Sequence, residues 1–220
     1  MVDMRAQESP FRPAWWGTDL AAAGVDARPR VGTYGEYEFE GLPPVPFELS
    51  GDLAWLAGQP AHEKWAIHGN ALEQLPALLE ACARDGLRLP TAFIRFMESS
   101  ALQDRVRSST ACFIFLDAAP VPSAVGGRLL RFLSDQQGCL YWYLHIVEDG
   151  EDHSVVCSTD LYGTEEYSEV DDPEEIRFCG ESFESFLCRY WLENEIWFAA
   201  VDGTPLPDVG PDYIARYNLG

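Results

Sequence analysis

Residues 132–147 read FLSDQQGCLYWYLHIV, and this stretch decides the fold. An apolar segment is followed by the polar sequence Asp135-Gln136-Gln137-Gly138 and then by a run of aromatic and branched residues. Runs of this kind, bounded by turn residues, are typical of paired β-strands. The stretch therefore predicts a β-hairpin in the second half of the chain.

Strand-like patterns on both sides extend this hairpin into a sheet. The four expected strands cover residues 112–116, 128–133, 140–147 and 153–157. Asp149-Gly150 is a tight-turn pair, and no connection is long enough to hold a crossover helix. The pattern predicts an antiparallel meander. A further strand is expected at residues 34–40, where Tyr37 and Phe39 lie on one face.

Three segments have helical spacing. Residues 70–84 predict a helix whose regular part begins near Leu75, because Pro76 follows directly. A second helix begins at Leu89-Pro90. Ser182 caps a third, with an apolar stripe from Phe183 to Phe198 and Glu193-Asn194-Glu195 on its polar side. The expected fold class is α+β, a mainly antiparallel sheet wrapped by helices.

The length of 220 residues allows one domain with an extension. Residues 1–30 are interrupted by proline and glycine, so they are expected to be irregular, with Trp15-Trp16 packed on the body. The predicted organisation is an N-terminal extension over residues 1–45, docked on the body, and a single domain over residues 46–220.

The charge is strongly negative and unevenly distributed. The chain carries a formal net charge of −21, and residues 148–195 alone hold sixteen acids against two arginines, a net −14. Such a field repels phosphate backbones, which argues against nucleic-acid binding, and attracts basic proteins. A solvated acidic surface that keeps the protein soluble is the alternative interpretation.

Six cysteines are present, and none forms a CxxC pair. Most lie in apolar runs, which favours reduced, buried thiols and a cytoplasmic protein. No segment approaches the roughly 18 apolar residues of a membrane span, so no membrane association is expected.

The sequence offers no motif for chemistry. The four histidines and the cysteines lack the short spacing of zinc ligands, and no Gly-x-Ser-x-Gly elbow or phosphate-binding glycine loop occurs. The predictions are no catalytic residue, no metal and no cofactor, and hence a protein that is not an enzyme.

The order of these elements resembles the SUKH superfamily over roughly residues 70–200. The resemblance rests on five short segments: Leu89-Pro90 with Phe93, Phe96 and Met97; residues 131–135 (RFLSD); residues 141–144 (YWYL); Val155-Val156; and residues 182–187 (SFESFL). It implies a protein-binding module, in bacteria often an immunity protein that neutralises a toxin. The superfamily has no shared catalytic residues, so none are carried over.

The leading hypothesis is a bacterial immunity-type protein that captures a basic partner, such as a cognate toxin, through acidic residues. The predicted contact residues are Glu165, Glu166, Glu169, Asp171, Asp172, Glu174 and Glu175, together with Asp135, Gln136 and Gln137 of the hairpin turn. A structural role is sufficient for that turn. The second hypothesis is a small-molecule-binding protein or an enzyme of a biosynthetic operon, because the many aromatic residues could line a pocket.

Overall fold

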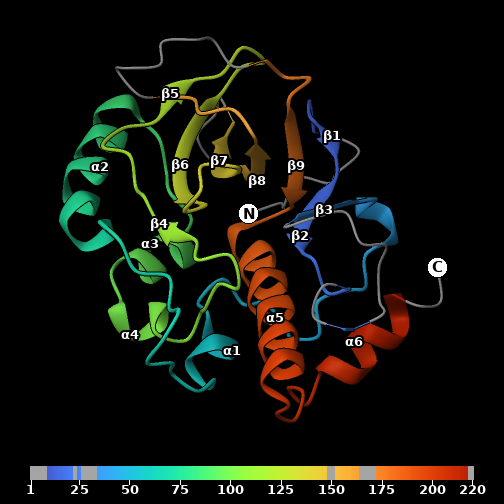
Figure 1. Ribbon diagram of the computed structural model, residues 1–220. Helices are drawn as coiled ribbons and strands as arrows, with labels where there is room; N and C mark the ends of the chain where they lie inside the picture. Colours follow the sequence, from blue (N-terminus) through green and yellow to red (C-terminus); the bar gives the residue numbers. More distant parts are fainter. Residues whose placement is uncertain (1–8, 22–23, 26–33, 148–151, 164–171, 218–220) are drawn as a thin grey trace.

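A seven-stranded mixed sheet lies at the centre of the computed structural model, which describes residues 9–21, 24–25, 34–147, 152–163 and 172–217. An antiparallel meander runs through β6 (Arg128–Ser134), β7 (Tyr141–Ile146), β8 (His153–Ser158) and β9 (Ile176–Gly180). At one edge β6 also pairs with β4 (Phe113–Ile114) and β5 (Val121–Pro122). At the other, β1 (Arg12–Pro13) lies parallel to β9 (Figure 1). The predicted α+β class and mainly antiparallel meander are confirmed.

Two parts of the chain differ from the expected pattern. The predicted irregularity of residues 1–30 is wrong for β1 and for β2 (Trp15–Thr18), which pairs with β3 (Tyr34–Tyr37) in a second, two-stranded sheet. The strand β9 is not among the four expected strands of the meander, which ended at residue 157. β1 is stabilised by pairing with the distant strand β9, and β2 by pairing with β3, so local sequence patterns did not show either strand.

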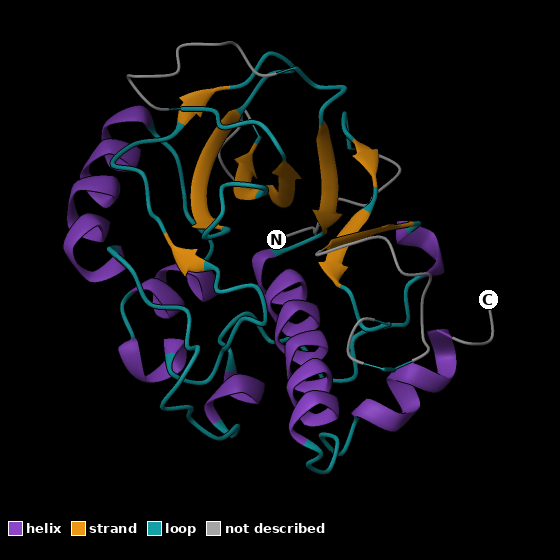
Figure 2. Cartoon of the chain, in the orientation of Figure 1, coloured by secondary structure: helices purple, strands orange, loops and turns teal. Residues whose placement is uncertain are grey.

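Helices cover the sheet and extend beyond it (Figure 2). They are α1 (Ala54–Ala57), α2 (Ala71–Asp85), α3 (Thr91–Met97), α4 (Ser100–Gln103), α5 (Phe183–Asp202) and α6 (Gly210–Tyr217), with a 3-10 helix, η2 (Phe39–Gly41). The helix predicted over residues 70–84 is confirmed as α2, but its regular part begins at Ala71 rather than near Leu75 and includes Pro76. Pro76 is exposed, so water can satisfy the carbonyl group that loses its helical partner.

The meander is buried on both faces. Trp142 and Leu144 of β7 point into the main core beneath α5, whereas Tyr143 packs in a smaller cluster with Phe11 and Phe178 on the other face. This alternation is the period of a β-strand, and full burial of one large apolar side chain stabilises the fold by roughly 1.5–3 kcal/mol. Packing on both faces therefore stabilises the strands whose edges carry the exposed side chains.

The predicted polar side of α5 lies inside the protein. Glu193, Asn194 and Glu195 are 0%, 1% and 8% exposed. Burial alone would raise the pKa of Glu195, but the His62 ring, whose Nε2 lies 3.0 Å from the carboxylate, and hydrogen bonds from Arg107 lower it below its ordinary value. The interpretation of these residues as a solvent-facing stripe is wrong, because each one has hydrogen-bonding partners from distant segments.

The start of α5 depends on a neutral histidine. The Ser182 and Ser185 side chains form a capping box, and the backbone N–H of Phe183 donates to Nε2 of His153 at 3.2 Å. Burial lowers the pKa of His153 to about 4, from an ordinary 6.5. The unfolded chain therefore takes up this proton at a higher pH than the folded protein does.

We expect His153 to destabilise the protein progressively as the pH falls from 6.5 to 4, by roughly 3 kcal/mol in total. His153→Gln keeps an acceptor for the Phe183 N–H and does not titrate. Urea unfolding at several pH values should thus show that the free energy of unfolding decreases less with falling pH in the variant than in the wild type. If the free energy of unfolding decreased equally with falling pH in both proteins, this role of His153 would be contradicted.

Candidate functional site

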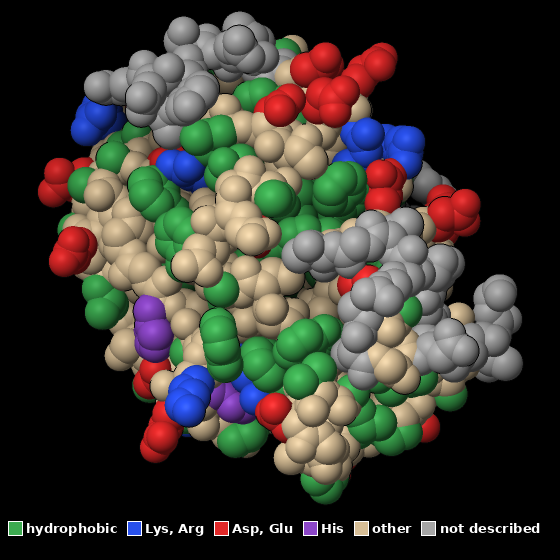
Figure 3. All heavy atoms as spheres, viewed as in Figure 1, with side chains coloured by type: hydrophobic (Ala, Val, Ile, Leu, Met, Phe, Trp, Pro, Cys, Tyr) green, Lys and Arg blue, Asp and Glu red, His purple; other side chains and the backbone are tan. Residues whose placement is uncertain are grey.

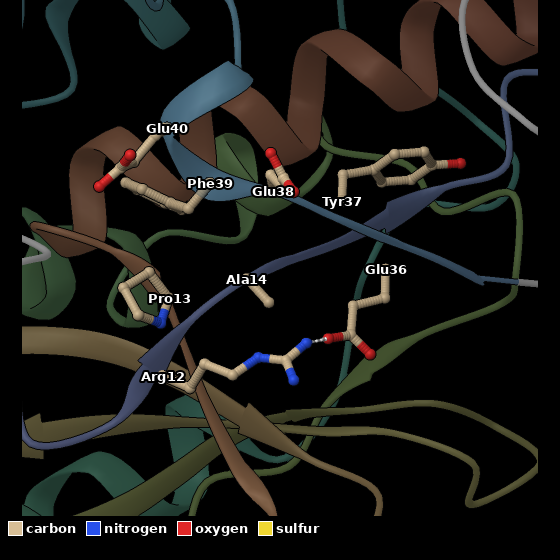
Figure 4. A pocket seen from close by; sticks show the side chains of 8 residues that line it. All are labelled: Arg12, Pro13, Ala14, Glu36, Tyr37, Glu38, Phe39 and Glu40. Carbon is tan, nitrogen blue, oxygen red and sulfur yellow. Dashed lines mark hydrogen bonds and ion pairs between the residues drawn. The ribbon is translucent and has the colours of Figure 1, made fainter.

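A surface pocket of about 660 Å³ opens beside β1, at the edge of the main sheet. Figure 4 shows its lining, which is Arg12, Pro13, Ala14, Glu36, Tyr37, Glu38, Phe39 and Glu40. The residues come from two segments only, β1 with the residue after it, and β3 with η2. The pocket thus lies where the N-terminal hairpin crosses the edge of the sheet.

Local structure explains how these side chains meet. β1 is in register with β9, so that Arg12 lies beside Arg177, and the Ala14 N–H donates to the Phe178 carbonyl at 2.9 Å. The chain then enters β2, whose partner β3 carries Glu36. The Phe39 ring packs edge-on against Phe178 at 5.1 Å, which anchors the wall of the pocket to β9.

The charges of the pocket are only partly balanced. The Arg12 guanidinium pairs with Glu36, as the dashed line in Figure 4 shows, and Nε of Arg177 lies 3.8 Å from the same carboxylate. Glu38 and Glu40 are exposed and form no ion pair with any residue that the structure describes. Both of these carboxylates are therefore available to a cationic group of a partner.

A second group of acids lies next to this pocket. Asp172 caps the turn before β9, accepting from the Glu174 N–H at 2.9 Å through its side chain and from the Glu175 N–H at 3.0 Å through its carbonyl. Arg177 then donates to the Glu174 carbonyl and also contacts Glu36. At the upper right of Figure 3, where β1 and β9 lie in Figure 1, acidic side chains are grouped around basic ones. We call this region, comprising Glu36, Glu38, Glu40, Asp172, Glu174 and Glu175, the acidic edge.

The acidic edge contains three of the predicted contact residues. Asp172, Glu174 and Glu175 are exposed there. The other four acids of the predicted set, Glu165, Glu166, Glu169 and Asp171, lie outside the described residues. The structure adds Glu36, Glu38 and Glu40, which sequence reasoning missed. Their signal was the alternation of acidic and aromatic residues at 34–40. The strand predicted there is confirmed only as far as Tyr37, because Phe39–Gly41 forms the 3-10 helix η2.

The predicted contact residues of the turn between β6 and β7 differ in their exposure to solvent. Gln136 and Gln137 are exposed, whereas Asp135 is only 3% exposed. One Asp135 oxygen accepts from Tyr34 at 2.7 Å, and the other accepts from the backbone N–H groups of Gln137 and Cys139. Asp135 thus shapes the turn from within, and only the two glutamines have side chains that a partner can reach.

The described cysteines and histidines give little support for a nucleophilic cysteine or a metal site. Cys112 contacts the hydroxyls of Tyr34 and Thr110, but burial raises the pKa of its thiol, which disfavours the nucleophilic thiolate. No group of three or more His, Cys, Asp or Glu side chains among the described residues is arranged to hold a metal ion. The acidic edge is therefore the candidate functional site.

Comparison of the chain with protein-family models, with curated proteins and with solved structures found no match. Within the described residues, no helix has the length and apolar character needed to cross a membrane.

Proposed function

We propose that this chain is a protein-binding module of the bacterial immunity type, which captures a basic partner through the acidic edge. The observation that carries the proposal is the imbalance of charge at this site. The acidic edge has six carboxylates, whereas the two guanidinium groups beside it, those of Arg12 and Arg177, both contact Glu36. Such a surface favours basic proteins and repels nucleic acids.

The geometry of the acidic edge supports a partner of protein size. The pocket beside β1 is concave and has an aromatic wall at Phe39, so it offers both charge and apolar area to a protruding side chain. Proline at position 13 blocks one route of association, because it has no N–H to pair with an added strand. Side chains rather than strand addition would therefore make the contact. A toxin that carries a basic surface is a partner of this kind.

Affinity capture from native cell extract at low salt tests the proposal. Wild-type bait would be compared with the triple variant Glu36→Gln, Glu38→Gln, Glu40→Gln. The matched control replaces Glu73, Glu80 and Glu98, exposed acids of α2 and the end of α3, by Gln, so the net charge changes equally. We expect a basic protein to be retained by the wild type and the control and lost by the first variant. Equal retention by all three baits would reject the acidic edge as the binding surface.

A further inference from the structure

A second pocket, of about 380 Å³, lies where the loop of residues 49–52 meets the first residues of α3 and α5. Its walls combine apolar side chains, among them Leu49, Pro90 and Phe183, with the polar groups of Asp52, His153 and Glu184. Pockets of this size and mixed lining are typical of small-molecule sites. None of its lining residues belongs to the acidic edge.

Glu184 places a negative charge in the wall of this pocket. Its side chain is 4% exposed and accepts hydrogen bonds from the Gly51 N–H at 2.5 Å, the Leu53 N–H at 3.0 Å and Nε1 of Trp55 at 3.1 Å. No Lys, Arg or His among the described residues forms an ion pair with it. Only neutral donors and the end of α5 therefore balance this charge.

His153 supplies an independent polar group. It is 5% exposed, and its Nε2 accepts the Phe183 N–H, so the ring proton is on Nδ1. Nδ1 has no hydrogen-bond partner among the described residues. Because His153 lines the pocket, this donor without a protein partner is available to an acceptor supplied by a ligand.

The remaining polar groups restrict the charge of that ligand. Asp52 is an exposed carboxylate whose nearest cation, Nη1 of Arg95, lies 3.9 Å away. The first N–H groups of α5 are already occupied, that of Phe183 by His153 and that of Ser185 by Ser182. An anion would therefore meet two carboxylates and few free donors, whereas a cation meets complementary charge.

We propose that this pocket binds a small primary ammonium ion that also carries a hydrogen-bond acceptor. The ammonium group interacts with the carboxylates of Asp52 and Glu184, and the acceptor takes the Nδ1 proton of His153. An apolar substituent packs against Leu49, Pro90 and Phe183. Amides of apolar amino acids have this combination of groups. The site is separate from the acidic edge, so each proposal can fail without the other.

Leucinamide and N-acetyl-leucinamide are the probes, because they differ in the ammonium charge and share the amide and the side chain. Binding is followed by NMR at the indole N–H of Trp55, which is hydrogen-bonded to Glu184 and is identified with Trp55→Phe. We expect millimolar leucinamide to shift this resonance in a saturable manner and the acetylated compound to leave it unchanged. Equal shifts by both probes, or none by either, would overturn the proposal.

Asp52→Asn is the test variant, since this side chain is exposed and asparagine keeps an oxygen that can accept from the Ser50 hydroxyl and the Ala54 N–H. We expect it to weaken leucinamide binding about tenfold, which corresponds to about 1.4 kcal/mol. Glu98→Gln is the control, because it removes an exposed charge from the end of α3, outside the pocket lining. If both variants weaken binding equally, the amine responds to the overall charge of the protein and the assigned site is wrong.

Discussion

Replacement of Glu193 by alanine is expected to lower the free energy of unfolding by about 3–5 kcal/mol. Glu193 is fully buried in α5, and its carboxylate accepts from Nε1 of Trp15 and from the hydroxyls of Tyr213 and Tyr217, each at 2.9 Å. These donors come from β2 and α6, so one side chain joins three elements. Alanine would leave buried donors unsatisfied and would open a cavity among aromatic rings.

Urea unfolding followed by tryptophan fluorescence measures this loss. Tyr217→Phe removes one of the three donors and is expected to cost about 1 kcal/mol, which provides a graded variant if the alanine protein does not fold. Glu73→Ala, at an exposed position of α2, is expected to change stability by less than about 0.5 kcal/mol. A loss below about 1 kcal/mol for Glu193→Ala would show that this network does not hold the three elements together.

Glu193 also illustrates which features of the fold could be predicted from the sequence and which could not. The helix and its cap at Ser182 could be predicted, because helical spacing and capping are local. The burial of Glu193 could not, since its donors lie 178, 20 and 24 residues away along the chain. A charged residue in a helix usually indicates solvent exposure, and only the positions of Trp15, Tyr213 and Tyr217 reverse that interpretation.

The association rate with the captured partner is expected to fall at least tenfold between about 0.05 M and about 0.5 M salt. The Debye length shortens to a few ångströms over this range, so the field of the acidic edge no longer reaches an approaching partner. Stopped-flow mixing with increasing salt measures the effect. An on-rate that does not change with salt would exclude electrostatic capture.

The glutamine variant of Glu36, Glu38 and Glu40 localises the effect. It should associate more slowly at low salt and show a weaker dependence on salt than the wild type. The control at Glu73, Glu80 and Glu98 carries the same net charge and should behave as the wild type does. Loss of the exposed Arg12–Glu36 pair has little influence on folding, because a surface pair contributes about 0–1 kcal/mol. Equal slowing in both variants would mean that overall charge, and not this surface, attracts the partner.

The acidic edge was only partly predictable for a related reason. The excess of acids before β9 was evident from composition, and Asp172, Glu174 and Glu175 lie at the surface as expected. The contribution of Glu36 depends on two pairings: that of β2 with β3, and the parallel pairing of β1 with β9, which joins segments about 165 residues apart. Such pairing follows from tertiary packing, and alternation along a single strand gives no information about it.

Hydrogen–deuterium exchange of the free and partner-bound protein tests the central claim most directly, because it locates the contact surface. We expect slower exchange in the complex at residues 36–41 and 172–177, with little change in α2. Slower exchange confined to α2 or to the exposed segment of residues 61–66, with residues 36–41 and 172–177 unaffected, would contradict binding through the acidic edge.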